Sequence, residues 1–412
     1  MAPAGNYEAL IAAIQGGANS VYFGVEKLNM RSHSANNFNL SDLENICNIC
    51  SENNVKSYLT LNIVLYGEDL EDAYKTIDAA KAAGVSAIIA SDMAAISYAV
   101  KIGLEVHIST QLSLSNIEAV RFYSQFADVV VLARELNLFQ VKEIYQKIQE
   151  ENICGPSGKL VEIEMFCHGA FCMAISGKCY LSLHEYNASA NRGSCYQLCR
   201  RGYEVTDLET GRSLEIDNKY IMSPKDLCTI EFVDKMINAG VTVFKIEGRA
   251  RPAEYVKKVV STYKKAIDAI SDGHFTPDYA ASLKTELAEV FNRGFWDGYY
   301  QGGRLGEWSD VYGSKATTKK SYCGKVTNYF SNISVAEILI ESSELKVGDN
   351  IIIVGPSTGV IENTIKEIRV ELEPTDKAVK GDKCSILIEE KLRRSDKVYI
   401  ISSKESSKAL NS

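Results

Sequence analysis

Short apolar runs alternate with longer segments of helical periodicity from the start of the chain to about residue 250. This alternation is typical of repeated strand–helix units that build a parallel sheet. Stretches such as LSDLENICNICSENN and EDLEDAYKTIDAAKAAG predict amphipathic helices. Seven runs have the length and composition of strands: 20–25, 56–63, 86–91, 105–111, 128–134, 160–166 and 243–248.

Seven strands are one short of a (β/α)8 barrel, and the chain opens at MAPAGN, which resembles the loop after a first strand. We therefore predict an α/β fold with a TIM-like (β/α) barrel over residues 1–300. Its first strand would be missing, so that the seam stays open or another segment fills it. An open, doubly wound sheet is the alternative, but the Gly-rich dinucleotide fingerprint follows none of the strands.

The pattern changes after helical segments at 251–272 and 277–293. A stretch rich in Gly and Tyr, RGFWDGYYQGGRLGEW, predicts a linker, and we place the division between domains at 301–319. From 320 to 405, short alternating runs with turn residues predict a small antiparallel β-barrel. These runs are GKVTNYF, AEILIE, VGDNIIIVGP, NTIKEIRVE, GDKCSILIE and SDKVYII.

The excursion 169–239 is far longer than the about 2–6 residues of an ordinary strand–helix connection. Five of the eleven cysteines fall within thirty-three positions at its start: Cys167, Cys172, Cys179, Cys195 and Cys199. Four thiols among glycines suit an iron–sulfur cluster or zinc, and the wide first spacing favours the cluster. Cys167 is expected in the strand wall, Cys228 competes as the fourth ligand, and a group of buried apolar thiols is the alternative.

Polar residues at the carboxyl ends of the predicted strands are the candidates for chemistry, because barrel active sites lie there. His168 could act as an acid or base, or bind substrate, and is about as often a structural residue. Glu164 would need a partner such as Lys245 or Arg249. Glu247 and Arg249 could bind a polar ligand in the mouth or form a structural ion pair.

Bulk composition narrows the function classes. A net charge of −8 argues against a protein that coats nucleic acid through a global positive field, although 245–265 and 315–325 are candidate local RNA-binding patches. No apolar run reaches the ~20 residues of a membrane span, and eleven cysteines without a secretory signal indicate the cytoplasm. The GxSxG, HExxH and P-loop motifs are absent, which counts against a hydrolase.

The segment EMFCHGAFCMAISGKCYLS resembles the signature of peptidase family U32, and APAGN, HISTQLSLSN, RGSCYQLCR, SPKDL and KIEGR resemble its other recurring blocks. The resemblance implies a TIM-like barrel and a C-terminal barrel similar to domain II of elongation factor Tu. It also implies a [4Fe–4S] cluster, with Cys228 open as an alternative to the fourth ligand. The ligands would be Cys172, Cys179, Cys195 and Cys199.

The same resemblance implies several activities. We expect oxygen-independent hydroxylation of the tRNA wobble uridine to 5-hydroxyuridine, with prephenate as oxygen donor and small-molecule co-substrate. Arg249 or Arg134 could meet the carboxylates of prephenate. The implied partners are tRNA and a paralogous family member, with no membrane. A collagenase-like peptidase and a non-catalytic RNA-binding scaffold with a structural metal are the alternatives.

Overall fold

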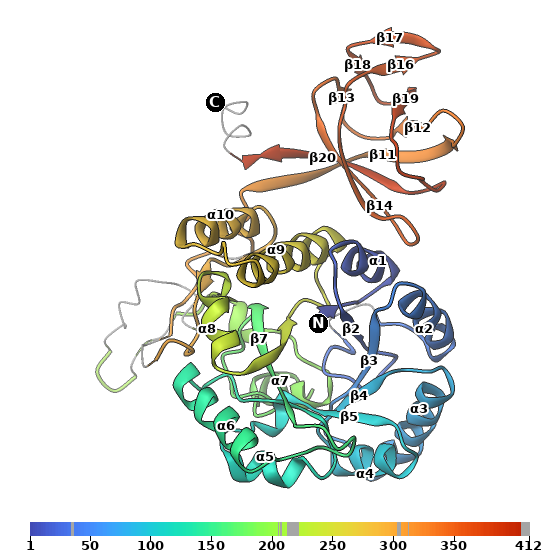
Figure 1. The fold of residues 1–412 in the computed structure, drawn as a ribbon. Helices are drawn as coiled ribbons and strands as arrows, with labels where there is room; N and C mark the ends of the chain where they lie inside the picture. Colours follow the sequence, from blue (N-terminus) through green and yellow to red (C-terminus); the bar gives the residue numbers. More distant parts are fainter. Residues whose placement is uncertain are drawn as a thin grey trace.

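Two hydrophobic cores divide the chain. A computed structural model describes residues 1–33, 37–204, 206, 208–211, 222–302, 306–311 and 313–404. One core is formed by residues before position 301, and the other by residues 323–398. Figure 1 shows the corresponding regions, with the C-terminal strands next to helices α1, α9 and α10.

The first region is built on a ten-stranded sheet in which β1 to β7 follow one another in chain order. Eight strands pair in parallel: β1 (Ala2–Pro3), β2 (Ser20–Phe23), β3 (Lys56–Leu61), β4 (Ala87–Ala90), β5 (Glu105–Ile108), β6 (Val129–Val131), β7 (Glu162–Gly169) and β9 (Val241–Ile246). We call these eight strands the strand ring. All seven predicted strands are confirmed. The sequence missed β1, β8 (Asp226–Cys228), which runs antiparallel to β7, and β10 (Phe295–Trp296), which pairs with β8.

Residues at the start of the chain fill the seam that the sequence left open. Ala2–Pro3 pairs with β2. The Met1 backbone nitrogen donates to the Phe244 oxygen at 2.7 Å, and the Ile246 nitrogen donates to the Met1 oxygen at 3.1 Å. The strand order therefore continues by hydrogen bonds from β9 through residues 1–3 to β2.

Helices surround the strand ring, as Figure 1 shows. They are α1 (Tyr7–Gln15), α2 (Leu43–Glu52), α3 (Leu70–Ala82), α4 (Met93–Lys101), α5 (Ile117–Tyr123), α6 (Leu138–Glu150), α8 (Val233–Asn238), α9 (Ala253–Ser271) and α10 (Pro277–Ala288). Several begin where a short polar side chain accepts a backbone N–H, as Asn6, Asp92 and Asn137 do. Such caps satisfy donors that the first helical turn leaves free.

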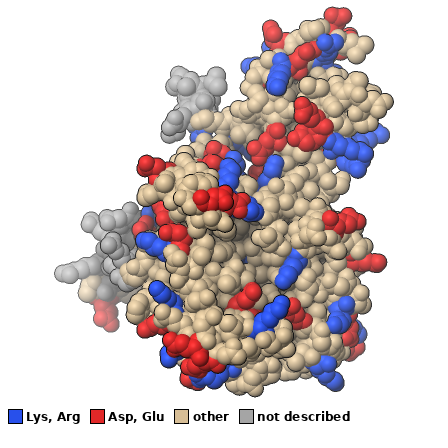
Figure 2. Space-filling view, viewed as in Figure 1, with Lys and Arg blue, Asp and Glu red and all other residues tan. Residues whose placement is uncertain are grey.

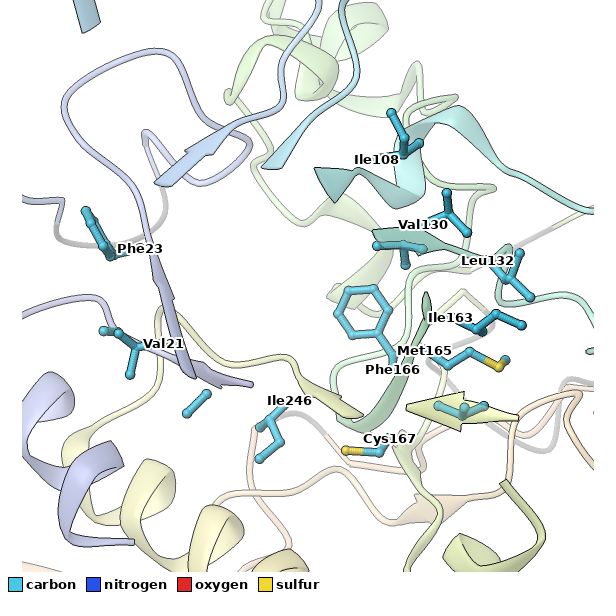
Figure 3. Packing of buried hydrophobic residues seen from close by; sticks show 14 of the residues in the cluster. Val21, Phe23, Ile108, Val130, Leu132, Ile163, Met165, Phe166, Cys167 and Ile246 are labelled. Atoms are coloured by element: carbon cyan, nitrogen blue, oxygen red, sulfur yellow. The ribbon is translucent and has the colours of Figure 1, made fainter. Parts of the chain in front are cut away.

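Side chains of β7 alternate between the enclosed space and the helices until the strand is interrupted. Figure 3 shows Phe166 and Met165 on opposite sides of β7. A shift in the pairing with β9 follows between Phe166 and His168. Such a bulge changes the direction of the next side chain, here that of His168.

The C-terminal region is an antiparallel β structure, as predicted. Its eight-stranded sheet has the order β15-β14-β20-β11-β12-β19-β16-β17, and β13 (Leu345–Lys346) pairs with β18 (Lys377–Ala378). The sheet strands are β11 (Thr318–Phe330), β12 (Val335–Ile340), β14 (Asn350–Gly355), β15 (Gly359–Thr364), β16 (Ile368–Val370), β17 (Glu373–Thr375), β19 (Lys383–Leu387) and β20 (Lys397–Ser403). The predicted strand NTIKEIRVE is divided in the structure: its first residues end β15 and its later residues form β16. Between them Ile365 is buried in the core.

Part of the predicted linker stretch is packed rather than extended. Trp296 and Tyr300 are buried in the first core, and the Tyr300 hydroxyl donates to the Phe166 oxygen at 3.0 Å. The two regions also touch directly, since Gln15 on α1 bonds the backbone of Thr358 and Val360, each at 2.9 Å. In the part of the chain that the structure describes, no helix has the length and apolar character to cross a membrane.

Candidate functional site

A cavity of about 450 Å³ opens at the carboxyl ends of the parallel strands. The strand ring contributes residues such as Thr60, Phe166 and Lys245, and the excursion after β7 covers the opening. In α/β proteins ligands bind at this end of the strands, where the loops converge. A second cavity, of about 740 Å³, lies between the two regions and is lined by no cysteine.

All four cysteines named from the sequence line the first cavity: Cys172, Cys179, Cys195 and Cys199. Cys172 is exposed and the other three are half-buried, whereas six of the remaining seven cysteines are buried. Burial raises the pKa of Cys199 to about 11. The positive charge of Arg200 acts in the opposite direction on the pKa of Cys199, but its effect is smaller than that of burial.

The donor set fits an iron–sulfur cluster in kind, because four cysteine thiolates are its usual ligands. Among the residues that the structure describes, no three His, Cys, Asp or Glu side chains converge closely enough to hold a single metal ion. The four thiols instead stand around one cavity. A cluster binds one thiolate at each iron, so its ligands are spread more widely than those of one ion.

The competing cysteines lie elsewhere. Cys228, the alternative fourth ligand, is buried in the core, where burial raises its pKa to about 11. Cys167 is also buried, and its thiol donates to the Lys245 oxygen at 3.4 Å. Cys47 and Cys50 lie on the buried face of α2, in the core. None of these four lines the cavity, so Cys199 is placed with the other three thiols and Cys228 is not.

The cavity is strongly cationic. Among the described residues of its lining, Glu247 is the one acidic side chain, and eight are basic: Arg31, Arg134, Lys178, Arg200, Lys245, Arg249, Arg251 and Arg293. Arg31, Lys245 and Arg293 form ion pairs with carboxylates, and the other five have none within the described residues. Figure 2 shows a different distribution on the face of the molecule in view, where acidic and basic side chains intermingle. The excess of cations therefore indicates an anionic ligand in the cavity.

Glu247 is held by Arg31 rather than by Arg249. The Arg31 guanidinium donates to the Glu247 carboxylate at 2.8 Å. The Glu247 backbone nitrogen donates to the His168 backbone oxygen at 2.8 Å. A Cβ atom on Gly169 would lie 2.3 Å from the Glu247 backbone oxygen. Gly169, with a φ of +105°, is therefore required for β7 and Glu247 to approach each other.

Arg249 lies buried beside Thr60, whose hydroxyl it reaches at 2.8 Å. A Cβ on Gly24 would lie 2.4 Å from the Arg249 Nη1 atom, so this glycine leaves room for the guanidinium. Burial lowers the pKa of Arg249 to about 10. Arg134 lies over the rings of Phe166 and Phe171. Both arginines proposed to bind carboxylates thus line the cavity.

Glu164 lies inside the strand ring, below the cavity. The Lys245 ammonium donates to Glu164 at 2.6 Å, and the His107 Nδ1 atom is 3.8 Å from its second oxygen. Burial alone would raise the pKa of Glu164, but Lys245 and His107 outweigh it and lower the pKa to about 2. Of the two partners considered from the sequence, Lys245 is the one present. The glutamate therefore belongs to a matched buried charge cluster.

His168 does not line the cavity. After the bulge its ring points toward Tyr255 and Tyr263 on α9 and toward Phe295. Burial, with a smaller effect of the charge on Arg251, lowers the pKa of His168 to about 3. The imidazole is therefore neutral and enclosed by aromatic rings. Without the bulge, strand alternation would direct it inward like Glu164 and Phe166.

Sequence reasoning missed Arg31, and it named two basic stretches whose side chains differ in how far they are paired. Arg31 follows β2, and the rule that strand ends carry the site could have found it. In 245–265 and 315–325, most of the basic side chains are already paired. Lys258 binds Glu289, Lys265 binds Glu286, and Lys320 binds Glu254. Arg249 and Arg251 in the first stretch form no ion pair within the described residues, and both line the cavity.

The chain thus combines an α/β fold with a cysteine-lined, cationic cavity at the carboxyl ends of its parallel strands. The sequence profile of peptidase family U32 matches residues 5–310, and the chain belongs to this family. It is 60% identical over 405 residues to a protein named "Collagenase" from Porphyromonas gingivalis, with 98% of each chain covered.

Two further relatives are named for the modification of RNA. The chain is 34% identical to "tRNA hydroxylation protein P1" of Bacillus subtilis, with 89% of this chain and 86% of that protein covered. It is 33% identical to "23S rRNA 5-hydroxycytidine C2501 synthase" of Escherichia coli, with 74% of this chain and 46% of that protein covered. The family therefore includes proteins named for peptide cleavage and proteins named for RNA hydroxylation.

Proposed function

We propose that this chain is an iron–sulfur enzyme that hydroxylates a pyrimidine base in RNA, with the wobble uridine of tRNA as the expected substrate. The observation that carries the proposal is the cavity itself. Four cysteines and eight basic residues line it, and no histidine among the described residues does. Such a lining suits a thiolate-bound cluster beside an anionic substrate.

The proposed architecture is a TIM-like barrel over residues 1–300 with a cysteine-rich insertion at 169–239. The parallel strand order and the hydrogen bonds of Met1 to β9 support it. After a linker at 301–319, residues 320–405 would form a β-barrel similar to domain II of elongation factor Tu. Its antiparallel strand order is consistent with this division.

In this proposal Cys172, Cys179, Cys195 and Cys199 hold the [4Fe–4S] cluster. When bound, the cluster supplies electron transfer. Arg134 and Arg249 bind the carboxylates of a co-substrate such as prephenate, which follows from the family resemblance. Glu247, fixed by Arg31, orients a polar group of the substrate. His168 has a positioning role, because its ring packs against Tyr263 and joins the end of β7 to α9.

A peptidase is the second candidate, and the relative named "Collagenase" favours it. Cleavage by a cysteine or serine nucleophile usually needs a histidine or another base within hydrogen-bond reach. The described residues of the cavity lining include no histidine, and Glu247 is already paired with Arg31. The geometry therefore favours RNA hydroxylation over peptide hydrolysis.

The test compares tRNA nucleosides by mass spectrometry in a deletion strain that carries wild-type protein, Cys195→Ala or Cys50→Ala. Cys50 is a buried thiol in α2 and serves as the matched control. We expect 5-hydroxyuridine derivatives with wild-type protein and Cys50→Ala, and at least about a tenfold loss with Cys195→Ala. Unchanged nucleosides in the deletion strain, together with collagen cleavage by purified Cys195→Ala, would instead establish the peptidase.

A further inference from the structure

Exposed tyrosines are concentrated at one place on the molecule. Of the tyrosines that the structure describes, five are exposed, with 36% to 70% of each side chain accessible: Tyr66, Tyr180, Tyr186, Tyr196 and Tyr203. We call these five residues the tyrosine rim. All of them belong to the excursion or to the loop after β3 that touches it. Single exposed aromatic residues are common, but a group of this size marks a binding surface.

Local contacts hold the tyrosine rim in place. The rings of Tyr186 and Tyr196 lie 5.2 Å apart, on α7 (Leu181–Tyr186) and on the loop before the short helix Leu198–Arg200. The Tyr196 nitrogen donates to the Ser182 hydroxyl at 3.0 Å. The Tyr203 hydroxyl donates to the Leu198 oxygen at 2.8 Å. The aromatic faces are therefore presented by an ordered backbone.

The loop after β3 is joined to the same surface. The Val64 nitrogen donates to the Asn191 oxygen at 3.1 Å. The Arg192 guanidinium lies 3.8 Å from the centre of the Tyr66 ring and is fixed by an ion pair with Asp69 at 2.6 Å. One face of Tyr66 is thus covered by a planar cation, while 52% of the side chain stays accessible.

Basic residues are interleaved with these rings. Residues 178–203 contain four basic residues and a single acidic one, Glu185. Arg192 pairs with Asp69 and Arg200 donates to the Pro224 and Phe171 oxygens, whereas Lys178 and Arg201 form no ion pair within the described residues. The Arg201 guanidinium lies 5.7 Å from the Tyr186 ring centre. Tyr180, which is 70% exposed, and Lys178 also line the cavity, so the surface leads directly to the four thiols.

We propose that the tyrosine rim binds the unpaired bases of a single-stranded RNA segment and leads one base to the cavity. Bases stack on aromatic faces whatever their sequence, and the neighbouring cations meet the phosphates. A proline-rich peptide could also pack on tyrosines, but it has no phosphates for these cations. The choice of RNA rests on the proposed function, and the position of the surface rests on the exposed rings.

The experiment measures fluorescence anisotropy of a labelled single-stranded RNA oligonucleotide with the full-length protein, without any requirement for activity. The test variant is Tyr186→Ala with Tyr196→Ala. Because both stacking faces are removed, we expect RNA binding at least about tenfold weaker. Tyr186→Phe with Tyr196→Phe should bind within about twofold of wild type, because the rings remain.

Phe139→Ala is the matched control, since Phe139 on α6 is 70% exposed, as Tyr180 is. We expect it to bind RNA like wild type, and circular dichroism checks that all variants fold. Equal RNA binding by the alanine variant and wild type, no RNA binding at all, or displacement of RNA by a collagen-like peptide would overturn the inference. Loss of hydroxylation with intact, tyrosine-dependent RNA binding would instead reject only the proposed chemistry.

Discussion

The interior of the strand ring and the cavity above it differ in how their buried charges are paired. Inside the ring, Glu164 is matched by Lys245 at 2.6 Å and approached by His107. In the cavity lining that the structure describes, Glu247 is the one acidic residue, and five of the eight basic residues form no ion pair with a carboxylate. Matched buried charges fix a single arrangement of side chains, whereas unmatched ones are costly to desolvate unless a ligand compensates them. This difference in charge pairing assigns the Glu164–Lys245 pair to stability and the cavity lining to function.

The largest effect is expected from breaking the matched cluster. Lys245→Met leaves the Glu164 carboxylate buried without its main partner and should lower the free energy of unfolding by about 3–5 kcal/mol. Urea unfolding followed by circular dichroism measures this loss. Adding Glu164→Leu to Lys245→Met should restore most of it, since both charges are then removed. An equally unstable double variant would show that the pair is not the cause.

A pH-dependent effect is expected from His168. Its folded pKa of about 3 lies below the unfolded value of about 6.5, so only the unfolded chain takes up a proton as the pH falls below neutrality. The stability contributed by neutral His168 is complete above pH ~6.5 and is lost toward pH ~3, by at most about 1.4 kcal/mol per pH unit. His168→Phe, which suits the surrounding aromatic rings, should flatten this slope in urea titrations. Parallel curves for the two proteins would contradict it.

The smallest effect on stability is expected in the cavity. Arg249 is buried and forms no ion pair within the described residues, so Arg249→Met removes a buried charge and one hydrogen bond to Thr60. We expect the free energy of unfolding, measured by thermal denaturation, to change by no more than about 1 kcal/mol in either direction. The same variant should lose the tRNA modification in the deletion strain. A destabilisation as large as that of Lys245→Met would remove the contrast between the two parts.

Periodicity carried most of the fold prediction. The seven long parallel strands and the antiparallel C-terminal strands follow from hydrophobic alternation, which depends on local sequence. The two-residue strands Ala2–Pro3 and Phe295–Trp296 could not be predicted, because they form only through pairing with distant segments. The glycines around Trp296 and Tyr300 predict a linker, but tertiary packing buries both side chains.

The part of the candidate site that depends on residue type and on position along the sequence could be predicted. The four cysteines and Arg249 were found in this way, and they line one cavity. His168 was not, since a register shift of one residue, which strand alternation cannot reveal, turns its ring outward. The tyrosine rim was not found either, because exposure of a ring depends on the folded excursion. Free basic charge was equally invisible, since ion pairing in 245–265 joins residues far apart in sequence.

The most direct test of the central claim is the iron and acid-labile sulfide content of the full-length protein purified without oxygen. The account predicts about four irons and four sulfides per chain for wild type and for Cys50→Ala, and their loss in Cys172→Ala with the fold retained. Protein that contains only zinc, or no metal under strict exclusion of oxygen, would contradict an iron–sulfur site in the cavity.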